Sequence, residues 1–198
     1  MTQDTHAALI MIDMQNGFIN AGSSLCVAGA AQTVPLCAQA LHAARSQNIM
    51  VIHAIRSYKS DGSDVERCRY ATWIQDRALS PSAAPVCSAE VPPELTPLSN
   101  ETVIVKPRFS AFFGTQLADL LREQDVKTVI LAGTTTPNCI RSTCYDAFSY
   151  DFDVVILEDC TSSRTDAVQA ANIEDMRYLG ATIMSCEEFA QGAALPPQ

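Results

Sequence analysis

The chain has 198 residues, of which 47% are hydrophobic and 18% are charged, and its formal net charge is −9. A chain of this length buries one sizeable core, so we expect a single domain over residues 1–198 with a frayed tail from about residue 190. Basic residues do not cluster, which excludes the usual footprint of a nucleic-acid partner. The longest apolar runs are strand-length and the N-terminus lacks the pattern of a signal peptide, so we expect a cytoplasmic protein with no membrane partner.

Strand-length apolar runs alternate with helix-like patterns along most of the chain. Near-continuous apolar strands separated by helices indicate a parallel sheet that is covered on both faces. The expected fold class is therefore α/β, with three layers and a six-stranded, mainly parallel sheet. In chain order, the expected strands cover about residues 8–12, 50–54, 102–105, 128–132, 154–157 and 181–184. The expected helices cover about residues 33–47, 115–124, 138–149 and 165–179.

The stretch from residue 57 to residue 100 differs from the rest of the chain. It is rich in Ser, Pro and charged residues, and only residues 70–74 suggest order. A structureless connection of this length is uncommon in a compact domain, so we expect it to contain a helix and functional loops.

Three chemically useful residues follow predicted strands. Asp13 and Lys106 each end an apolar run, and Cys139 comes shortly after a third run that ends at Gly133. Open α/β sheets build their binding sites at the carboxyl ends of their strands. Taken singly, each charge is better explained as an ordinary solvated residue at a strand end. The three together predict a site.

Cys139 is expected to lie in the first turn of a helix. Pro137 is favoured at a first helical position, and Thr136 is a plausible N-cap. The free N–H groups and the positive dipole of that turn favour a thiolate and can bind an oxyanion. A small buried cysteine without chemical function is an equally good interpretation of this segment alone.

The eight cysteines are scattered, contain no C-x-x-C pair and are accompanied by only three histidines. This pattern gives little support to a zinc site. For a chain of this length without a secretory signal, reduced thiols are expected rather than disulfides. We therefore expect no metal.

Three motifs identify a family resemblance that covers nearly the whole chain, from the strand before Asp13 to about Phe189. They are residues 12–15 (IDMQ), 106–112 (KPRFSAF) and 133–139 (GTTTPNC). In these motifs the chain closely resembles the isochorismatase-like cysteine hydrolases, which include nicotinamidases, N-carbamoylsarcosine amidohydrolase and ureidoacrylate hydrolases. The resemblance implies that Asp13, Lys106 and Cys139 are the catalytic residues.

The resemblance also implies a Rossmann-like strand order, with the first and fourth strands adjacent at the centre and the second and third beside the first. It implies a cysteine-dependent amidohydrolase that cleaves an amide, carbamoyl or ureido C–N bond of a small molecule through a thioester. A cis peptide would join Thr134 to Thr135, and the backbone N–H groups of Thr135 and Cys139 would form the oxyanion hole. No cofactor is implied, and the chain is expected to form a homo-oligomer, either a dimer or a tetramer.

The sequence indicates the type of reaction more clearly than it indicates the substrate. Phe18 could wall the pocket, although a core position suits it equally well. Arg56 and Tyr58 follow the second strand, and Arg56 could hold a substrate carboxylate through a bidentate pair; a surface arginine is nearly as good an explanation. Arg108 is a weaker candidate of the same kind. Residues 53–58 contain one histidine and no acid, which argues against the metal site and the activity of nicotinamidases.

Two other classes remain open at this stage. One is a Cys–His hydrolase with His53 as the base, since the other histidines lie in the N-terminal tail and within a predicted helix. The other is a thiol redox or sensor protein that uses its cysteines without amide turnover. Cys139 itself argues against true isochorismatase activity, because enzymes that cleave that vinyl ether lack the nucleophilic cysteine.

Overall fold

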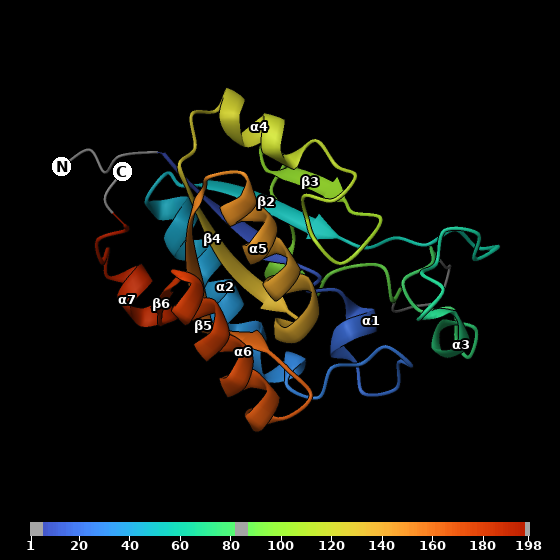
Figure 1. Ribbon diagram of the computed structural model, residues 1–198. Coiled ribbons are helices and arrows are strands. Elements are labelled where there is room, and N and C mark those ends of the chain that lie inside the picture. The colour runs from blue at the N-terminus through green and yellow to red at the C-terminus, as the bar shows by residue number, and fades with distance from the viewer. Residues whose placement is uncertain (1–5, 82–86, 197–198) are drawn as a thin grey trace.

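A six-stranded sheet forms the centre of the molecule, with the strand order β3-β2-β1-β4-β5-β6 (Figure 1). The computed structural model describes residues 6–81 and 87–196. All five pairings between neighbouring strands are parallel. The expected α/β class, the six strands and the central position of β1 beside β4 are confirmed. The strands are β1 (Ala7–Ile12), β2 (Met50–Ile55), β3 (Thr102–Val105), β4 (Thr128–Thr134), β5 (Asp153–Ser162) and β6 (Thr182–Met184).

Helices cover both faces of the sheet, as the apolar strands predicted. The core cluster on one face includes residues of α2 and α7, and the cluster on the other face includes residues of α4, α5 and α6 (Figure 1). The helices are α1 (Asn16–Ile19), α2 (Ala30–Ser46), α3 (Tyr70–Trp73), α4 (Leu117–Glu123), α5 (Arg141–Ser149), α6 (Asp166–Leu179) and α7 (Cys186–Ala190). Two short turns complete the described elements, a 3₁₀ turn η1 (Pro93–Leu95) and a π turn η2 (Thr136–Ile140).

Strand β1 supplies both halves of the core because its side chains alternate between the two faces. Leu9 and Met11 belong to the cluster under α2, whereas Ile10 and Ile12 belong to the cluster under α4 and α5. Every residue of β1 is buried. The end of this strand therefore lies in the middle of the protein, where a polar side chain is shielded from bulk water.

The sequence patterns missed the short helices α1 and α7. The four residues of α1 are too few to show a hydrophobic period. Helix α7 carries a readable signal, because Ser185 and Glu188 form a reciprocal capping box at its start. Beyond α7, the tail that was expected to be frayed packs Ala193 and Leu195 against the core. No helix within the described ranges has the length and apolar character needed to cross a membrane.

The segment after β2 builds a small hydrophobic cluster of its own around Trp73, which is buried. The Trp73 ring lies 6.3 Å from the ring of Tyr58 and 5.7 Å from that of Tyr70, measured between centroids. Phe18 of α1 also belongs to this cluster. The expected helix in this region is α3, and the cluster holds it beside the segment that follows β1.

Candidate active site

The sheet itself positions Asp13 and Lys106. Asp13 directly follows β1, and its backbone N–H donates to the carbonyl of Ala54 at 2.9 Å. Lys106 directly follows β3, and its backbone N–H donates to the carbonyl of Ile55, also at 2.9 Å. Both side chains are 0% exposed. The two strands that flank β2 therefore bring a carboxylate and an ammonium group to the same buried region.

Lys106 connects the three predicted catalytic residues. Its Nζ donates to Asp13 Oδ2 at 2.7 Å and lies 3.7 Å from Cys139 Sγ. A third bond, of 3.2 Å, goes to the carbonyl oxygen of Arg108. An ammonium group has three N–H donors, so this set occupies all of them. The structure thus brings Asp13, Lys106 and Cys139 together, although the sheet separates their strands.

The three threonines before Cys139 fasten this turn to the end of β5. Thr135 and Thr136 each donate a hydroxyl hydrogen bond to the carbonyl of Ser162, at 3.1 and 2.9 Å. The Ser162 hydroxyl in turn donates to Thr134 Oγ1 at 2.9 Å. The peptide bond between Thr134 and Thr135 is cis, as the resemblance implies. The prediction that Thr136 is the N-cap is wrong. The turn η2 already begins at Thr136, and the Thr136 hydroxyl donates to the carbonyl of Ser162.

Cys139 lies in η2, immediately before α5. The Cys139 carbonyl accepts a hydrogen bond from Thr143 Oγ1 at 2.7 Å, and Thr143 Oγ1 itself accepts the backbone N–H of Ala111 at 3.0 Å. Thr143 therefore joins the turn of the cysteine to the segment that follows Lys106. Its only signal in the sequence was the spacing of four residues from Cys139, which is one helical turn.

The charges around Cys139 act in opposite directions on its thiol. The side chain is 1% exposed. Burial raises the pKa of the Cys139 thiol and the negative charge of Asp13 raises it further, while the positive charges of Lys106 and Arg69 lower it. The net effect is a pKa above the ordinary value, so the cysteine rests as a thiol and needs a proton acceptor to become a nucleophile. Asp13 Oδ1 is buried and has no hydrogen-bond partner among the described residues, which leaves it free to accept that proton.

Gln15 aligns the segments that follow β1 and β2. Its Oε1 accepts the backbone N–H of Arg56 at 2.7 Å, and its Nε2 donates to the Arg56 carbonyl at 2.7 Å and to the Ala89 carbonyl at 2.6 Å. The buried side-chain amide of Gln15 thus bonds both the backbone N–H and the backbone carbonyl of Arg56, as the backbone of a neighbouring strand would. Gln15 belongs to the motif at residues 12–15, but the sequence alone did not indicate this role.

Arg56 and Tyr58, predicted to bind substrate, share a partner inside the protein. Arg56 is fully buried and forms an ion pair with Glu66, and its Nη1 also donates to the Pro107 carbonyl at 2.8 Å. The Tyr58 hydroxyl donates to Glu66 Oε2 at 2.6 Å. Burial raises the pKa of Tyr58, which keeps this phenol protonated. Glu66 therefore neutralises the charge that was expected to meet a substrate carboxylate.

The other two predicted substrate residues lie in different surroundings. Phe18 is buried, and its ring centroid lies 5.6 Å from the guanidinium carbon of Arg69. The side chain of Arg108 is exposed, and its Nη1 donates to the carbonyl of Asp64 at 3.2 Å. Arg108 meets the catalytic group through its backbone, since its carbonyl accepts from Lys106.

The His53 side chain pairs with a residue at the end of β3 that lies away from the catalytic group. Its Nε2 lies 3.0 Å from Glu101 Oε2, and Glu101 also accepts a bond of 2.7 Å from Arg45 Nε. Glu101 precedes β3, whereas Lys106 follows it, so His53 faces the opposite end of that strand. Burial lowers the pKa of His53. This arrangement favours Asp13 over His53 as the base for the cysteine.

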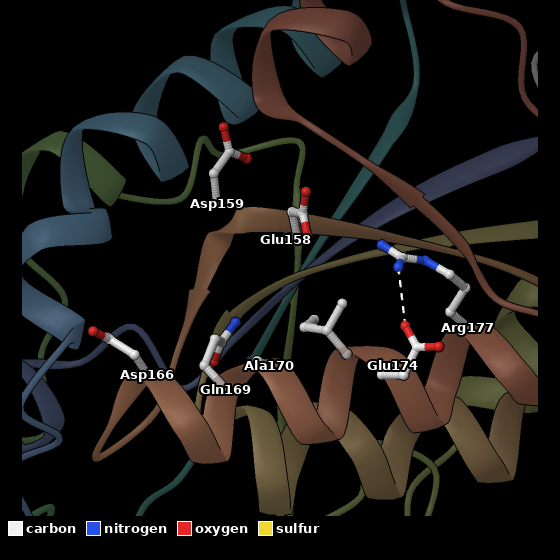
Figure 2. A pocket seen from close by; sticks show the side chains of 8 residues that line it. Glu158, Asp159, Asp166, Gln169, Ala170, Glu174 and Arg177 are labelled. Atoms are coloured by element: carbon white, nitrogen blue, oxygen red, sulfur yellow. Dashed lines mark hydrogen bonds and ion pairs between the residues drawn. The ribbon is translucent and has the colours of Figure 1, made fainter.

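Within the described ranges, no group of three or more His, Cys, Asp or Glu side chains could hold a metal ion. A pocket of about 590 Å³ lies beside β5 and α6 (Figure 2). Its walls carry an ion pair between Arg177 and Glu174, and they include none of the predicted site residues. The predicted chemistry therefore concentrates at the ends of β1, β3 and β4.

Comparison with known proteins identifies the family of the chain. The family model described as the isochorismatase domain matches residues 7–188. The chain belongs to the isochorismatase family. This membership confirms the resemblance that the three sequence motifs indicated, and it agrees with the all-parallel α/β sheet.

Individual members of the isochorismatase family resemble the chain over most of its length. A probable inactive nicotinamidase of Arabidopsis thaliana is 35% identical over 195 residues, which cover 96% of this chain and 97% of that protein. Maleamate amidohydrolase of Pseudomonas putida is 33% identical over 173 residues, covering 85% and 78%. The crystal structure of an isochorismatase family protein from Desulfovibrio vulgaris has a TM-score of 0.86 and 42% identity, covering 95% of this chain and 98% of that one.

Proposed function

We propose that this isochorismatase-family chain is a cysteine-dependent amidohydrolase. It hydrolyses an amide, carbamoyl or ureido C–N bond of a small molecule through a thioester on Cys139. The observation that carries this proposal is the position of the Lys106 ammonium, in contact with both the Asp13 carboxylate and the Cys139 sulfur in a fully buried site. Relatives named maleamate amidohydrolase and ureidoacrylate amidohydrolase support the reaction class.

The first step transfers the proton of the Cys139 thiol to Asp13. Lys106 holds Asp13 Oδ2, so Oδ1 is the oxygen that remains to accept the proton. The same ammonium lies close enough to Sγ to stabilise the thiolate by its charge. A thiolate is a stronger nucleophile than water toward the carbonyl carbon of an amide. The covalent route also divides one difficult hydrolysis into two easier steps, acyl transfer and deacylation.

The tetrahedral intermediate places a negative charge on the former carbonyl oxygen. The backbone N–H groups of Thr135 and Cys139 are the proposed donors to that oxyanion, and such donors act best when they are held in place beforehand. The hydrogen bonds from the threonines to Ser162 hold this turn. Collapse of the intermediate breaks the C–N bond, and the leaving nitrogen takes the proton from Asp13. Asp13 then deprotonates a water that cleaves the thioester and restores the thiol.

An ammonia-release screen on small primary amides and N-carbamoyl acids tests the proposal. We expect turnover by the unaltered protein and none by Cys139→Ala or Asp13→Asn. Mass spectrometry after brief mixing with substrate should show an acyl adduct on the peptide that contains Cys139. If Cys139 formed a mixed disulfide by exchange with a small disulfide, releasing one small thiol, while no amide was turned over, a redox or sensor function would replace the proposed one.

Activity without a cofactor, a homo-oligomeric state and a cytoplasmic location stay predictions for this protein. We do not expect nicotinamide to be a preferred substrate of this protein. The described side chains after β2 form the Arg56–Glu66–Tyr58 network, where nicotinamidases are expected to hold their metal. A small amide or ureido compound, with or without a carboxylate, fits the proposed site better.

A further inference from the structure

Arg69 lies where the segments that carry the catalytic residues meet. It immediately precedes α3, and its guanidinium carbon lies 4.8 Å from the ring centroid of Phe109 and 5.6 Å from that of Phe18. Phe18 is in α1, five residues after Asp13, and Phe109 is three residues after Lys106. The two rings therefore hold the cation beside the loops that deliver the acid and the lysine, since aromatic faces attract a guanidinium.

One end of this guanidinium is buried without a partner. Nη1 of Arg69 is inaccessible and makes no hydrogen bond to any described residue. A buried donor that stays unpaired costs free energy, so such groups usually indicate a ligand or a function. Arg56 differs, because Glu66 and the Pro107 carbonyl already engage it. Arg56 also has two buried nitrogens without a partner, Nε and Nη2, but Glu66 already balances its charge, whereas Arg69 forms no ion pair with a described residue.

The charge of Arg69 interacts with the proposed catalytic groups. Burial lowers the pKa of Arg69, but the negative charges of Cys139, Tyr58, Glu66 and Asp13 outweigh this effect and raise it. Arg69 in turn lowers the pKa of the Cys139 thiol. The charge of Arg69 therefore favours the thiolate form of Cys139, and its contacts with Phe18 and Phe109 place it beside the segments that follow Asp13 and Lys106.

We propose that Arg69 is the anion-binding residue of the substrate site and that it holds a carboxylate of the substrate while the scissile carbonyl lies at Cys139. The inference rests on the proposed amidohydrolase function and specifies its substrate class as small amides or ureido compounds that carry a carboxylate. A guanidinium suits this task because its planar N–H groups match the two oxygens of a carboxylate. Phe18 and Phe109 fix the plane of the guanidinium, so little freedom is lost when the anion binds.

A second role for Arg69 must be separated from this one. If Arg69 acted only by stabilising the Cys139 thiolate, its removal would slow every reaction of that sulfur equally. If it binds the anionic part of a ligand, its removal would slow the reaction with anionic partners far more than that with neutral ones. Iodoacetate and iodoacetamide form a matched pair for this purpose, because each alkylates a thiolate with loss of iodide and only iodoacetate carries a carboxylate.

The experiment measures the rates at which both reagents alkylate Cys139 at one pH, followed by peptide mass spectrometry. We expect Arg69→Gln to lower the ratio of the iodoacetate rate to the iodoacetamide rate by about ten- to a hundredfold, as loss of a charge-assisted hydrogen bond implies. Arg69→Lys should give an intermediate ratio, because it keeps the charge but loses the planar fork. Arg67→Gln makes the same change of charge at an exposed position two residues away and should leave the ratio unchanged.

Three results would overturn the inference: an equal loss of rate with both reagents, an unchanged ratio in Arg69→Gln, or an equal fall in Arg67→Gln. If Arg69→Gln failed to fold, Arg69→Lys would decide, and an unchanged ratio in that variant would count against the bidentate contact.

Failure of the proposed function would be recognised separately. If Cys139 reacted with neither reagent, the amidohydrolase proposal would fail, and titration calorimetry with maleate would decide the role of Arg69. Binding weakened at least about tenfold by Arg69→Gln, but not by Arg67→Gln, would support the anion site. Equal binding by all three proteins would overturn it.

Discussion

Gly133 of β4 lies opposite Ile12 of β1 in the parallel register. A Cβ atom on Gly133 would overlap the carbonyl oxygen of Ile12 and would lie 2.8 Å from its nitrogen. The φ angle of Gly133 is also +114°, a region that side chains with L configuration avoid. Ile12 precedes Asp13, and Gly133 begins the segment that ends at Cys139. The close approach of these two residues therefore brings the end of the strand before Asp13 against the segment that leads to Cys139.

Replacement of this glycine should damage both stability and activity. We expect Gly133→Ala to lower the free energy of unfolding by at least about 2 kcal/mol, because the new methyl group overlaps backbone and the φ angle is unfavourable. Urea unfolding measures the first effect, and turnover of a confirmed amide substrate measures the second. Gly22→Ala is the matched control, since a Cβ at Gly22 has no neighbour within 4 Å. Equal stability of the two variants would contradict the role assigned to the contact.

Cys139 should be the sole nucleophile. We expect Cys139→Ser and Cys139→Ala to fold normally and to lose about 10⁴-fold or more in kcat, since removal of a nucleophile abolishes the covalent route. Circular dichroism checks the fold and ammonia release checks turnover. The exposed Cys68 provides the control, because Cys68→Ser should keep full activity. Alkylation of Cys68 or Cys87 ahead of Cys139, with activity retained, would argue against the assignment.

Asp13 and Lys106 should behave as one unit with the cysteine. Each of Asp13→Asn and Lys106→Met should cost nearly as much activity as the double variant, because groups that share one proton-transfer network lose activity non-additively. Loss of one partner also leaves a buried charge uncompensated, which should cost about 3–5 kcal/mol of stability. The kinetics should therefore be compared at a temperature where every variant is folded.

An exposed lysine provides the control for this pair. Lys127 forms an ion pair with Asp125, and the two side chains are 53% and 62% exposed. Lys127→Met should change neither turnover nor the unfolding midpoint measurably. Near-normal kcat in folded Asp13→Asn or Lys106→Met would refute the proposed division of roles.

The pH dependence of Cys139 alkylation should report the charge of Lys106. The reactive thiolate forms as the pH rises through the pKa of Cys139, and the positive charge of Lys106 lowers that pKa. Loss of this charge in Lys106→Met should therefore raise the pKa and move the alkylation profile to higher pH. The rate of alkylation with neutral iodoacetamide, measured against pH, checks the shift. An identical profile in the variant would mean that Lys106 does not influence the thiol.

Removal of metal ions should leave activity unchanged, because the proposed mechanism relies on Asp13, Lys106 and Cys139 alone. Dialysis against a chelator, followed by kinetics on a confirmed substrate, checks this expectation. Metal analysis of the purified protein provides the complementary measurement. Stoichiometric zinc or iron, with activity that returned only when that ion was restored, would contradict the metal-free mechanism.

Local patterns in the sequence were enough to predict the framework. Parallel strands that are buried on both faces need continuous apolar residues, and this composition marked all six strands, although β5 continues through polar residues to Ser162, five residues beyond its predicted end. A charged residue ends two of these apolar runs, and the combination of both with Cys139 is how Asp13 and Lys106 were found. The strand order came from the family resemblance and was confirmed by the described topology.

Contacts between distant segments decided the rest. No local pattern shows that Glu66 neutralises Arg56, that Gln15 joins two loops or that Arg69 lies over the rings of Phe18 and Phe109. These relationships depend on how the segment after β2 packs against the ends of the strands. Secondary structure follows from the periodicity of neighbouring residues, whereas the partner of a buried charge is determined only when the whole chain has closed around it.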